Sequence, residues 1–524
     1  MNYDLSLPEV LEEAYQKHPD KEAIYDGLSR LSYRQLYEDV QLLTSGLSQI
    51  GIKKGDRVIA SLPNWNEFVT IYFSLASLGA ILVPCNTRYR TEELEYILED
   101  CGAKVAFISE DSGHIDTLNH YLKTSTNGKT LEHIITVRFK KDGHTSFAEL
   151  LDLGQKSQVQ AATINPVEDV FSILYTSGTT GKPKGAMLTH KNVVHTAKIS
   201  AEYMECSSED VFLVAVPAFH VFGMVPGIMS AISVAGKIVF MEQFKAEKAL
   251  KLIEQEKISV HHGVPTMFIL ELNHAEFKNV DLSSLRTGII AAAPCPEEIV
   301  KKIRTDMGCD VVVSYGLTES SAGVTMTSFD DDDAVRSETV GKVMPGAEAK
   351  VVDSNRQEVA TNEVGELAIK SFGVMKGYYQ LPEKTSEAID HEGWFYTGDL
   401  ATIDERGYIR IVGRKKEMII RGGYNIYPRE IEEIFYAHPS VLEVAVIGLP
   451  DTVLGEVTCA AIKLKPNQQE DETSMKEYIK GKIANYKIPD HFIFLEELPM
   501  TGSGKIKKMA LESEVREKLK ASLR

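Results

Sequence analysis

Apolar residues along the first 340 positions or so recur with the spacing of helices and then collect in short runs, and this alternation repeats several times. The runs are short and are bounded by glycine or charged residues, as buried strands are. Four such pairs of helix and strand are residues 36–50 and 56–60, 92–100 and 104–108, 246–256 and 258–262, and 297–306 and 310–314. The alternation predicts an α/β fold with largely parallel sheets, which we expect to form two α/β sheet subdomains.

The pattern changes after this part of the chain. Residues 341–412 alternate like strands and are broken by glycine and aspartate turns, which predicts a small β-rich subdomain. The tail is typical of a compact α+β unit, with helices predicted over residues 428–438 and 474–484 and strands over residues 444–447 and 460–464. We therefore expect a large N-terminal domain, residues 1–413, hinged at a charged junction to a small α+β C-terminal domain, residues 414–524.

Two uncharged stretches are long enough to raise the question of a membrane span. Residues 68–86 contain Gly79 and Pro84, which divide the stretch into a helical part and a short strand. Residues 211–236 are uncharged apart from His220, and they contain prolines and glycines that a simple spanning helix rarely carries. Both stretches are therefore predicted to be buried core, and no transmembrane segment is expected.

The charge balance narrows the classes of partner. The chain has 57 basic and 75 acidic residues and a net charge of −18. An acidic chain without a basic stripe is a poor candidate for nucleic acid or anionic membranes, although a local site can still hold a small anion. The six cysteines form no Cys-x-x-Cys pair and no signal peptide is evident, so a reducing, cytoplasmic setting is expected. A homodimer is compatible with the sequence, which does not determine the oligomeric state.

A loop after the strand-like residues 170–175 concentrates groups that bind phosphate. Residues 176–185 read TSGTTGKPKG and hold four hydroxyls, three glycines and two lysines. Glycines let backbone N–H groups approach an anion, hydroxyls donate hydrogen bonds, and lysines neutralise charge. The loop differs from the P-loop of ATPases, because Pro183 stands where a serine or threonine would hold Mg²⁺. Composition alone leaves a phosphate loop and a flexible surface turn equally open.

The string over residues 175–185, YTSGTTGKPKG, resembles the signature of the superfamily of acyl-CoA synthetases, firefly luciferase and peptide-synthetase adenylation domains. The resemblance extends over nearly the whole chain through further motifs in the expected order. It implies that the loop holds ATP and that Thr176 and Lys184 also take part in catalysis. The phosphate-binding residues so implied are Thr176, Ser177, Gly178, Thr179, Thr180, Gly181, Lys182, Pro183 and Lys184.

Residues 315–319, YGLTE, resemble the second signature of the superfamily. The implied roles are stacking of Tyr315 on adenine, a hydrogen bond from Thr318 to the α-phosphate close to Gly316, and ligation of Mg²⁺ by Glu319. A carboxylate beside a triphosphate requires a cation between them, and Mg²⁺ prefers oxygen ligands. Taken alone, Glu319 would be an ordinary residue at the start of a helix.

Three more motifs complete the implied nucleotide site. Ala292, Ala293 and Pro294 resemble the segment that lies along the adenine, although a tight strand end would give the same string. Asp399, in WFYTGD, resembles the residue that accepts hydrogen bonds from the ribose hydroxyls, although aspartate after Thr-Gly is also common in turns. Arg414 matches the arginine that contacts ribose or phosphate in the family.

The C-terminal region resembles the mobile part of the superfamily. Lys416 matches the hinge position, and Gly423 matches the glycine over which the pantetheine arm of coenzyme A passes, where a β-carbon would crowd the tunnel. Lys505, in PMTGSGK, matches the catalytic lysine that neutralises charge on the carboxylate and the α-phosphate during adenylation. The family often has arginine three residues later. Lys508 stands there instead, which weakens an expected role for that position but not for Lys505.

These motifs imply a two-step reaction that uses ATP, Mg²⁺ and coenzyme A. The substrate carboxylate attacks the α-phosphorus and releases pyrophosphate. The C-terminal domain then rotates about Lys416, and the thiolate of coenzyme A displaces AMP. The predicted enzyme is an AMP-forming acid:CoA ligase. An aryl-CoA ligase, a luciferase-like oxidase and a stand-alone adenylation enzyme that loads a carrier protein are the alternatives. A nucleotide sensor without catalysis is disfavoured, because Glu319 and Lys505 are present.

The acyl pocket is expected around residues 217–224, which read PAFHVFGM. His220 matches an aromatic residue that gates the carboxylate, and a buried, hydrogen-bonded histidine is the other interpretation. No acidic residue lies between positions 217 and 230 to pair with an α-ammonium group, so an amino acid substrate is disfavoured. Ala291 stands where many aryl and long-chain relatives have glycine. Residues 288–294 and 418–428 most resemble the medium-chain acyl-CoA synthetase branch, and this resemblance implies a medium-chain fatty acid. The residues expected to line the pocket are His220, Val221, Phe222, Met224, Val264 and Ala291.

Overall fold

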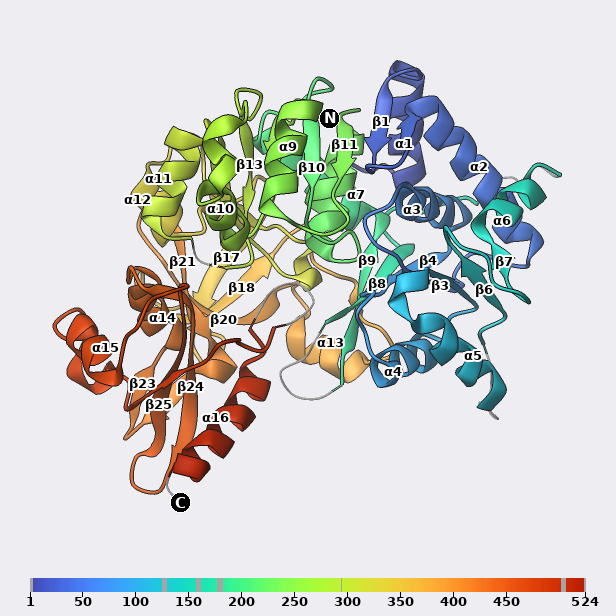
Figure 1. Cartoon of the computed structure of the whole chain (residues 1–524). Helices are drawn as coiled ribbons and strands as arrows, with labels where there is room; N and C mark the ends of the chain where they lie inside the picture. The colour runs from blue at the N-terminus through green and yellow to red at the C-terminus, as the bar shows by residue number, and fades with distance from the viewer. Residues whose placement is uncertain are drawn as a thin grey trace.

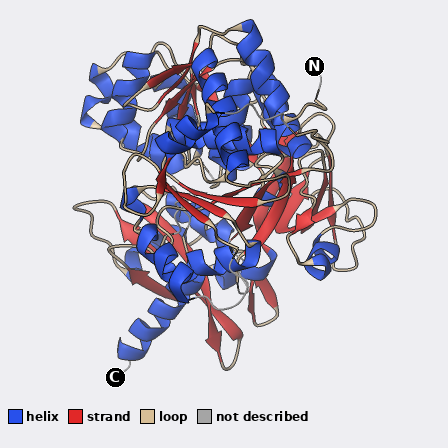
Figure 2. Ribbon diagram, turned by 90° about the vertical axis from the view of Figure 1, so that its right-hand side faces the viewer, coloured by secondary structure: helices blue, strands red, loops and turns tan. Residues whose placement is uncertain are grey.

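The computed structural model describes residues 3–124, 130–156, 162–176, 182–293, 295–500 and 506–522. Within these ranges the chain up to Arg414 forms three sheets, and the chain after it forms a fourth. Figure 1 shows the elements from β22 onward, in orange and red, gathered at one side of the larger body. The view in Figure 2 shows helices covering the strands of that body. The expected α/β fold with a β-rich part and a small α+β unit is confirmed.

The first α/β sheet has eight strands, most of which pair in parallel. Its order is β19 (Gly377–Tyr378), β9 (Lys184–Thr189), β8 (Val170–Thr176), β4 (Ile81–Pro84), β3 (Arg57–Ser61), β5 (Val105–Ile108), β6 (His133–Thr136) and β7 (Thr145–Ser146). β9 is the exception, because it pairs antiparallel with β8, in a hairpin, and with β19. The helices in this part of the chain are α2 (Tyr33–Gln49), α3 (Asn66–Leu78), α4 (Thr91–Cys101), α5 (His114–Thr124) and α6 (Phe147–Gly154).

The second α/β sheet has nine strands, with a parallel centre from β1 to β14. Its order is β16 (Lys342–Val343), β15 (Thr325–Met326), β14 (Asp310–Tyr315), β13 (Thr287–Ile290), β12 (Val260–His261), β10 (Val211–Val214), β11 (Lys237–Phe240), β1 (Glu22–Tyr25) and β2 (Arg30–Ser32). Its helices are α1 (Leu7–Lys17), α7 (His190–Tyr203), α8 (Ser230–Ser233), α9 (Ala246–Glu256), α10 (Pro265–Leu272), α11 (Glu297–Asp306) and α12 (Asp333–Glu338).

The two remaining sheets are antiparallel for the most part. The β-rich sheet has the order β17 (Glu348–Val352), β18 (Gly365–Lys370), β20 (Phe395–Ile403) and β21 (Ile409–Arg414), with α13 (Pro382–Ala388) nearby in the chain. The C-terminal sheet has the order β23 (Tyr424–Ile426), β22 (Ile419–Arg421), β25 (Gly455–Leu464) and β24 (Val441–Asp451), and β26 (His491–Phe494) pairs with β25. Its helices are α14 (Pro428–Tyr436), α15 (Glu472–Ile479) and α16 (Lys508–Ser522).

Local sequence explains where three of the helices begin or end. Thr189, the last residue of β9, accepts a hydrogen bond from the Asn192 N–H and so caps α7, which lets the strand turn directly into the helix. α3 ends at Gly79, whose φ of +65° is a left-handed conformation that favours glycine. α14 begins with Pro428, whose missing N–H is not needed in the first helical turn.

The two uncharged stretches are buried, as expected. In α3 every residue except Glu67 is buried, and β4 follows as a short core strand. The second stretch contains β10, a π-helical segment over Gly223–Met229 that includes Pro226, and α8. None of the helices in the described ranges combines the length and the apolar character that a membrane span requires.

The predicted end of one C-terminal helix is wrong. α15 ends at Ile479 rather than at residue 484, because the chain leaves the helix at Lys480 and Gly481 adopts a φ of +79°.

The acidic run 330–333 precedes and begins α12. Asp332 caps this helix through the Val335 N–H at 2.8 Å. Its neighbours also have partners, since Asp331 accepts a hydrogen bond from Tyr408 and Asp333 forms an ion pair with Arg304.

Candidate active site

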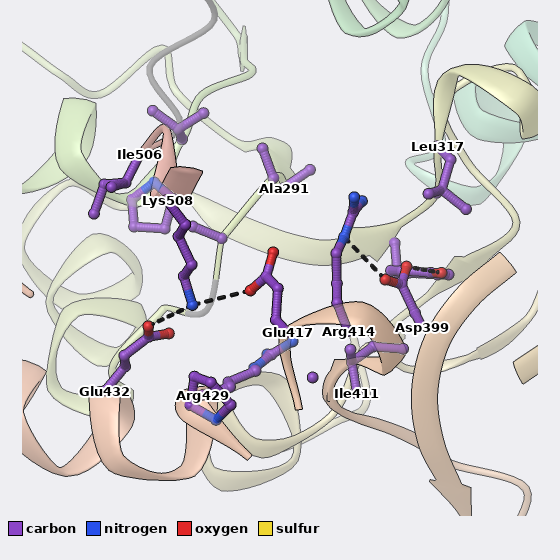
Figure 3. A pocket seen from close by; sticks show the side chains of 18 of the residues that line it. Ala291, Leu317, Asp399, Ile411, Arg414, Glu417, Arg429, Glu432, Ile506 and Lys508 are labelled. Carbon is purple, nitrogen blue, oxygen red and sulfur yellow. Dashed lines mark hydrogen bonds and ion pairs between the residues drawn. The ribbon is translucent and has the colours of Figure 1, made fainter. Parts of the chain in front are cut away.

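A cleft of about 2750 Å³ brings together residues from both α/β sheets, the β-rich sheet and the C-terminal unit. Its walls include the ends of β8 and β14, the hairpin of β20 and β21, and the first residues of α14 and α16. The carboxyl ends of parallel strands meet at this edge, which is where α/β sheets place ligands. Figure 3 shows one wall of the cleft from close by.

The predicted phosphate loop connects β8 to β9. Thr176 ends β8 and pairs across the hairpin with Lys184, which begins β9, and both residues line the cleft. The Lys184 ammonium lies 3.9 Å from the ring centroid of Tyr378. Burial lowers the pKa of Lys184, and the nearby Glu319 carboxylate opposes that shift by stabilising the charged form. A half-buried lysine in this place can neutralise the charge of a phosphate group.

Part of the predicted loop lies away from the cleft. Lys182 is exposed, and its ammonium lies 5.1 Å from the ring centroid of Tyr96 on α4. The Tyr96 hydroxyl donates a hydrogen bond to the Pro183 carbonyl oxygen at 2.9 Å. Lys182 and Pro183 therefore contact Tyr96 of α4, and their expected place at the phosphates stays a prediction. The other predicted residues of the loop, which lie outside the described residues, are Ser177, Gly178, Thr179, Thr180 and Gly181.

Thr318 and Glu319 lie in a short 3₁₀ turn after β14 and line the cleft. The Tyr378 hydroxyl donates a hydrogen bond to Glu319 Oε1 at 3.0 Å. Gly316 is needed just before the turn, because a β-carbon there would lie 2.1 Å from the Ala322 carbonyl oxygen. No cluster of three metal-binding side chains occurs among the described residues. A single carboxylate fits a nucleotide-bound Mg²⁺, which takes its remaining oxygens from phosphates and water.

Tyr315, Asp399 and Arg414 form a connected group in the cleft wall. Asp399 and Arg414 pair across β20 and β21, and Arg414 Nε lies 3.2 Å from Asp399 Oδ1. The Tyr315 hydroxyl donates a hydrogen bond to Asp399 Oδ2 at 2.6 Å. Asp399 is only 4% exposed, so these partners stabilise its charge in place of water. Burial and the Asp399 carboxylate raise the pKa of Tyr315 well above its ordinary value, so the phenol remains a donor.

Three alanines follow Ile290 at the end of β13, and Ala291, Ala292 and Ala293 all line the cleft. Ala292 has a φ of +74°, a left-handed conformation that residues with a side chain seldom adopt. Strained backbone of this type is concentrated where a chain contacts a ligand. Pro294, the last residue of the predicted adenine segment, lies outside the described residues.

Five of the six predicted acyl-pocket residues line the cleft, namely His220, Val221, Phe222, Val264 and Ala291. His220 is half-buried, and its Nδ1 accepts a hydrogen bond from the Phe222 N–H at 3.3 Å. Its own turn therefore fixes the orientation of the imidazole. The position is compatible with both interpretations of His220, a residue that faces the substrate and a hydrogen-bonded histidine.

Met224 is the exception, and its expected place in the acyl pocket is wrong. Its side chain is completely buried in the main core, because the π-helical segment packs on α7 and β10 and turns this residue toward them. The sequence interpretation also missed one face of α10. The residues of that face, spaced i, i+3, i+4 and i+7, are Thr266, Ile269, Leu270 and Asn273. The helical spacing could have revealed them once α10 was placed beside the cleft.

The C-terminal residues divide between the cleft and the surface. Lys416 lines the cleft, and so do Ile506 and Lys508 after the predicted catalytic Lys505, which itself lies outside the described residues. Gly423 does not line the cleft, and an added β-carbon would meet nothing within 4 Å. The expected crowding of the pantetheine tunnel concerns the thioester-forming arrangement, so it stays a prediction. In this conformation, the φ of +86° in the turn between β22 and β23 is a separate reason for glycine.

Comparison with known proteins agrees with this geometry. Residues 11–379 match the model of the AMP-binding enzyme family, and residues 430–505 match that of the AMP-binding enzyme C-terminal domain. YngI of Bacillus subtilis (strain 168), named as an acyl-CoA synthetase, is 40% identical over 97% of this chain and 96% of its own. The mitochondrial medium-chain acyl-CoA ligase ACSF2 of Macaca fascicularis is 37% identical over 96% of this chain and 86% of its own.

A solved structure supports the same conclusion. The anthranilate CoA ligase AuaEII, in complex with anthranoyl-AMP, superposes with a TM-score of 0.89 at 28% identity and covers 98% of both chains. The chain thus belongs to the AMP-binding enzyme family. It is an AMP-forming acid:CoA ligase, and ATP and coenzyme A are its co-substrates. The sequence prediction of this enzyme class is confirmed.

Proposed function

We propose that this ligase activates a medium-chain fatty acid and transfers it to coenzyme A. The observation that carries the proposal is the apolar wall of the cleft formed by Phe219, Val221, Phe222, Val264 and Ile269. Each methylene group buried against such a wall contributes about 0.8 kcal/mol, so an alkyl chain gains affinity with length until the pocket is full. The medium-chain ligase ACSF2 among the relatives supports the same choice.

An aryl acid is the second candidate. AuaEII is an anthranilate CoA ligase with the same fold, and an apolar wall can also hold an aromatic ring. Ala291 favours the alkyl chain, since its methyl group narrows the cleft beside the adenylate site.

We propose that the nucleotide lies along the wall from Ala292 to Asp399. Tyr315 and the alanine segment contact the adenine, while Asp399 and Arg414 contact the ribose hydroxyls. Asp399 is preorganised for this, because its charge is already stabilised by two fixed partners before the ribose binds. Thr318 follows on the same wall and is placed for the α-phosphate.

We propose that Thr176, Lys184 and the loop between them hold the phosphates, with Glu319 as the protein ligand of Mg²⁺. The metal ion supplies positive charge close to the phosphate oxygens. The chain contributes the Lys184 ammonium and the Tyr378 hydroxyl, which fixes the Glu319 carboxylate by its hydrogen bond. The carboxylate of the acid then approaches an α-phosphate whose negative charge is already partly neutralised.

We propose that the domains divide at residues 413 and 414 and that the C-terminal domain turns about Lys416 between the two half-reactions. Support comes from the separate C-terminal sheet and from the position of Gly423 outside the cleft, while residues beside Lys505 line it. This arrangement suits the adenylation step. Gly423 would reach the cleft only after rotation. A cytoplasmic location and a homodimer complete the proposal, and cell fractionation and light scattering would measure them.

A panel of acids tests the substrate class. Coenzyme A-dependent AMP release should be largest with hexanoate, octanoate or decanoate and smaller with acetate, benzoate, cinnamate or anthranilate. Ala291→Gly, which widens the same wall, should shift the preference of the enzyme toward longer acids. Activity confined to aromatic acids would favour the aryl-CoA ligase. If a phosphopantetheinylated carrier replaced coenzyme A with higher efficiency, the enzyme would instead load a carrier protein.

A further inference from the structure

The wall of the cleft contains a charged cluster that the proposed chemistry leaves without a role. Lys508 Nζ, at the start of α16, lies 2.9 Å from Glu417 Oε2 and 2.7 Å from Glu432 Oε1 on α14. All three side chains are largely buried, since between 15% and 29% of each remains exposed. Figure 3 shows the lysine between the two carboxylates. Three charges taken so far out of water are costly unless each is paired.

Lys508 follows directly after a contact between two described stretches of the chain. Met500 and Ile506 form an antiparallel bridge, and the Lys507 N–H donates a hydrogen bond to the Pro499 carbonyl at 2.7 Å. These contacts fix the backbone just before α16. Lys508, the first residue of that helix, then pairs with Glu417, the neighbour of Lys416.

The two carboxylates of the cluster differ in how firmly they are held. Glu432 is fixed on α14, and its Oε1 also accepts a hydrogen bond from the Val446 N–H at 2.8 Å. Glu417 lies in the short 3₁₀ turn after β21, where Lys508 holds its carboxylate. Glu417 is thus the carboxylate that can move if the lysine charge is removed.

Glu417 has a second cation within electrostatic reach. Figure 3 shows its carboxylate between Lys508 and Arg414. Burial disfavours the charge on Arg414, yet the pKa of this guanidinium is raised, because Asp399 and then Glu417 face it. Without Lys508, Glu432 would repel Glu417 and Arg414 would attract it, and both forces act in the same direction.

We propose that Lys508 is a positioning residue for the nucleotide site, which holds Glu417 away from Arg414 so that the guanidinium stays on Asp399 and faces the nucleotide. The inference rests on the proposed nucleotide contacts of Asp399 and Arg414. It assigns a role to a position where the family often has arginine, and a guanidinium could bind the same two carboxylates.

The test is the affinity of the whole enzyme for MgATP, measured by isothermal titration calorimetry without any acid. Lys508→Met should weaken MgATP binding about tenfold, because the freed Glu417 competes for the guanidinium. Lys508→Arg should bind MgATP like the wild type. Lys518→Met is the matched control, since Lys518 pairs with Glu514 at 3.1 Å on the same helix and does not line the cleft. It should leave the affinity unchanged.

Second substitutions separate this role from a merely structural one. In the Lys508→Met background, Glu417→Gln should restore MgATP affinity to within about twofold of the wild type, because it removes the competing charge. Glu432→Gln should restore clearly less affinity, because it removes the repulsion but leaves the competing Glu417 charge near Arg414. If both restore the affinity equally, or neither does, the proposal is wrong.

Two further outcomes keep the test decisive. If Lys508→Met does not fold, Lys508→Gln keeps N–H donors for both carboxylates and should show the same pattern of rescue in a weaker form. If Arg414→Ala binds MgATP as tightly as the wild type, the proposed nucleotide site itself is wrong, and not only the role of Lys508. Normal affinity in Lys508→Met, with Arg414→Ala impaired, would overturn the positioning role alone.

Discussion

At the scale of single residues, the nucleotide wall depends on one nearly buried carboxylate. Asp399 accepts a hydrogen bond from Tyr315 and pairs with Arg414, so β14 and the hairpin of β20 and β21, which are distant in the chain, meet at this group. Its low exposure means that its charge is stabilised by these partners rather than by water. The same partners fix the carboxylate for the two ribose hydroxyls of the proposed nucleotide site.

We expect Asp399→Asn to lower kcat/KM for ATP roughly tenfold to a hundredfold, since a hydrogen bond to a charged group contributes about 1.5–3 kcal/mol. The amide also turns an N–H group toward either the ribose or Arg414. Steady-state kinetics with varied ATP would measure the change. Asp404→Asn, in the turn of the same hairpin, is the control and should leave KM for ATP nearly unchanged. An unaltered kcat/KM for ATP in Asp399→Asn would exclude the ribose contact.

Residue types alone left several of these positions ambiguous. Glu319, Asp399 and His220 each have a common structural role as well as the catalytic one implied by the family resemblance. For Glu319 and Asp399 the described contacts now place the carboxylate in the cleft, beside Lys184 and Arg414 respectively. Those neighbours come from other elements, which is why spacing within a motif could not identify them.

At the scale of elements, the cleft wall at the proposed acyl pocket depends on a buried histidine. His262, just after β12, bonds through Nε2 to the Pro226 carbonyl at 3.1 Å, and its Nδ1 accepts the Ile289 N–H at 3.1 Å. It therefore ties the π-helical segment, which carries Pro226 into the cleft wall, to β13. This arrangement requires a neutral ring with one donor and one acceptor nitrogen.

The pH dependence of stability follows from this geometry. Burial, with a smaller effect of the adjacent His261, lowers the pKa of His262 from 6.5 to about 3. The unfolded chain takes up this proton near pH 6.5 and the folded chain does not. The stability that the neutral ring contributes is thus fully present above pH 6.5 and is lost as the pH falls toward 3.

As the pH falls from 6.5 toward 3, we expect His262 alone to lower the free energy of unfolding by up to about 1.4 kcal/mol per pH unit. His262→Gln, whose amide offers one donor and one acceptor, should remove that part of the slope. Urea denaturation between pH 7.5 and pH 5 would measure it, with the exposed His391→Gln as control. A wild-type slope in His262→Gln would show that His262 is not the titrating group.

At the scale of the whole molecule, residues from the N-terminal sheets and from the C-terminal unit line the same cleft. Arg414, which precedes Lys416 in the chain, and Glu417, which follows it, both line the cleft. A site assembled from two units can change its composition when one unit turns. That property suits a reaction with two half-reactions on one acyl group.

We expect Lys416→Pro to keep adenylation close to the wild-type rate and to slow thioester formation from preformed acyl-adenylate roughly tenfold or more. Proline fixes φ and is tolerated in the first turn of the short helix at Lys415–Glu417, so the present arrangement survives while rotation is restricted. Pyrophosphate release and acyl-CoA formation would be measured separately. Lys416→Ala, which keeps φ free, should affect both steps little. Equal loss of both steps in Lys416→Pro would contradict a hinge at this residue.

The sequence by itself determined much of this protein. Apolar spacing predicts α9 and α11 with their observed limits, because an amphipathic helix needs only local periodicity. The motif strings identified the enzyme class and most residues of the cleft, because backbone approach to phosphate demands particular residues at fixed places in a loop. Local caps such as Thr189 and Gly79 likewise act within a few residues.

Tertiary structure alone decided how distant segments meet. It placed Met224 in the core, turned Lys182 toward Tyr96, and brought Thr266 and Ile269 of α10 into the wall of the cleft. Side-chain direction there depends on what packs behind each element, which no local pattern contains. The pairing of Lys508 with Glu417 belongs to the same class, because it joins two segments more than 90 residues apart whose charges match only once the chain is folded.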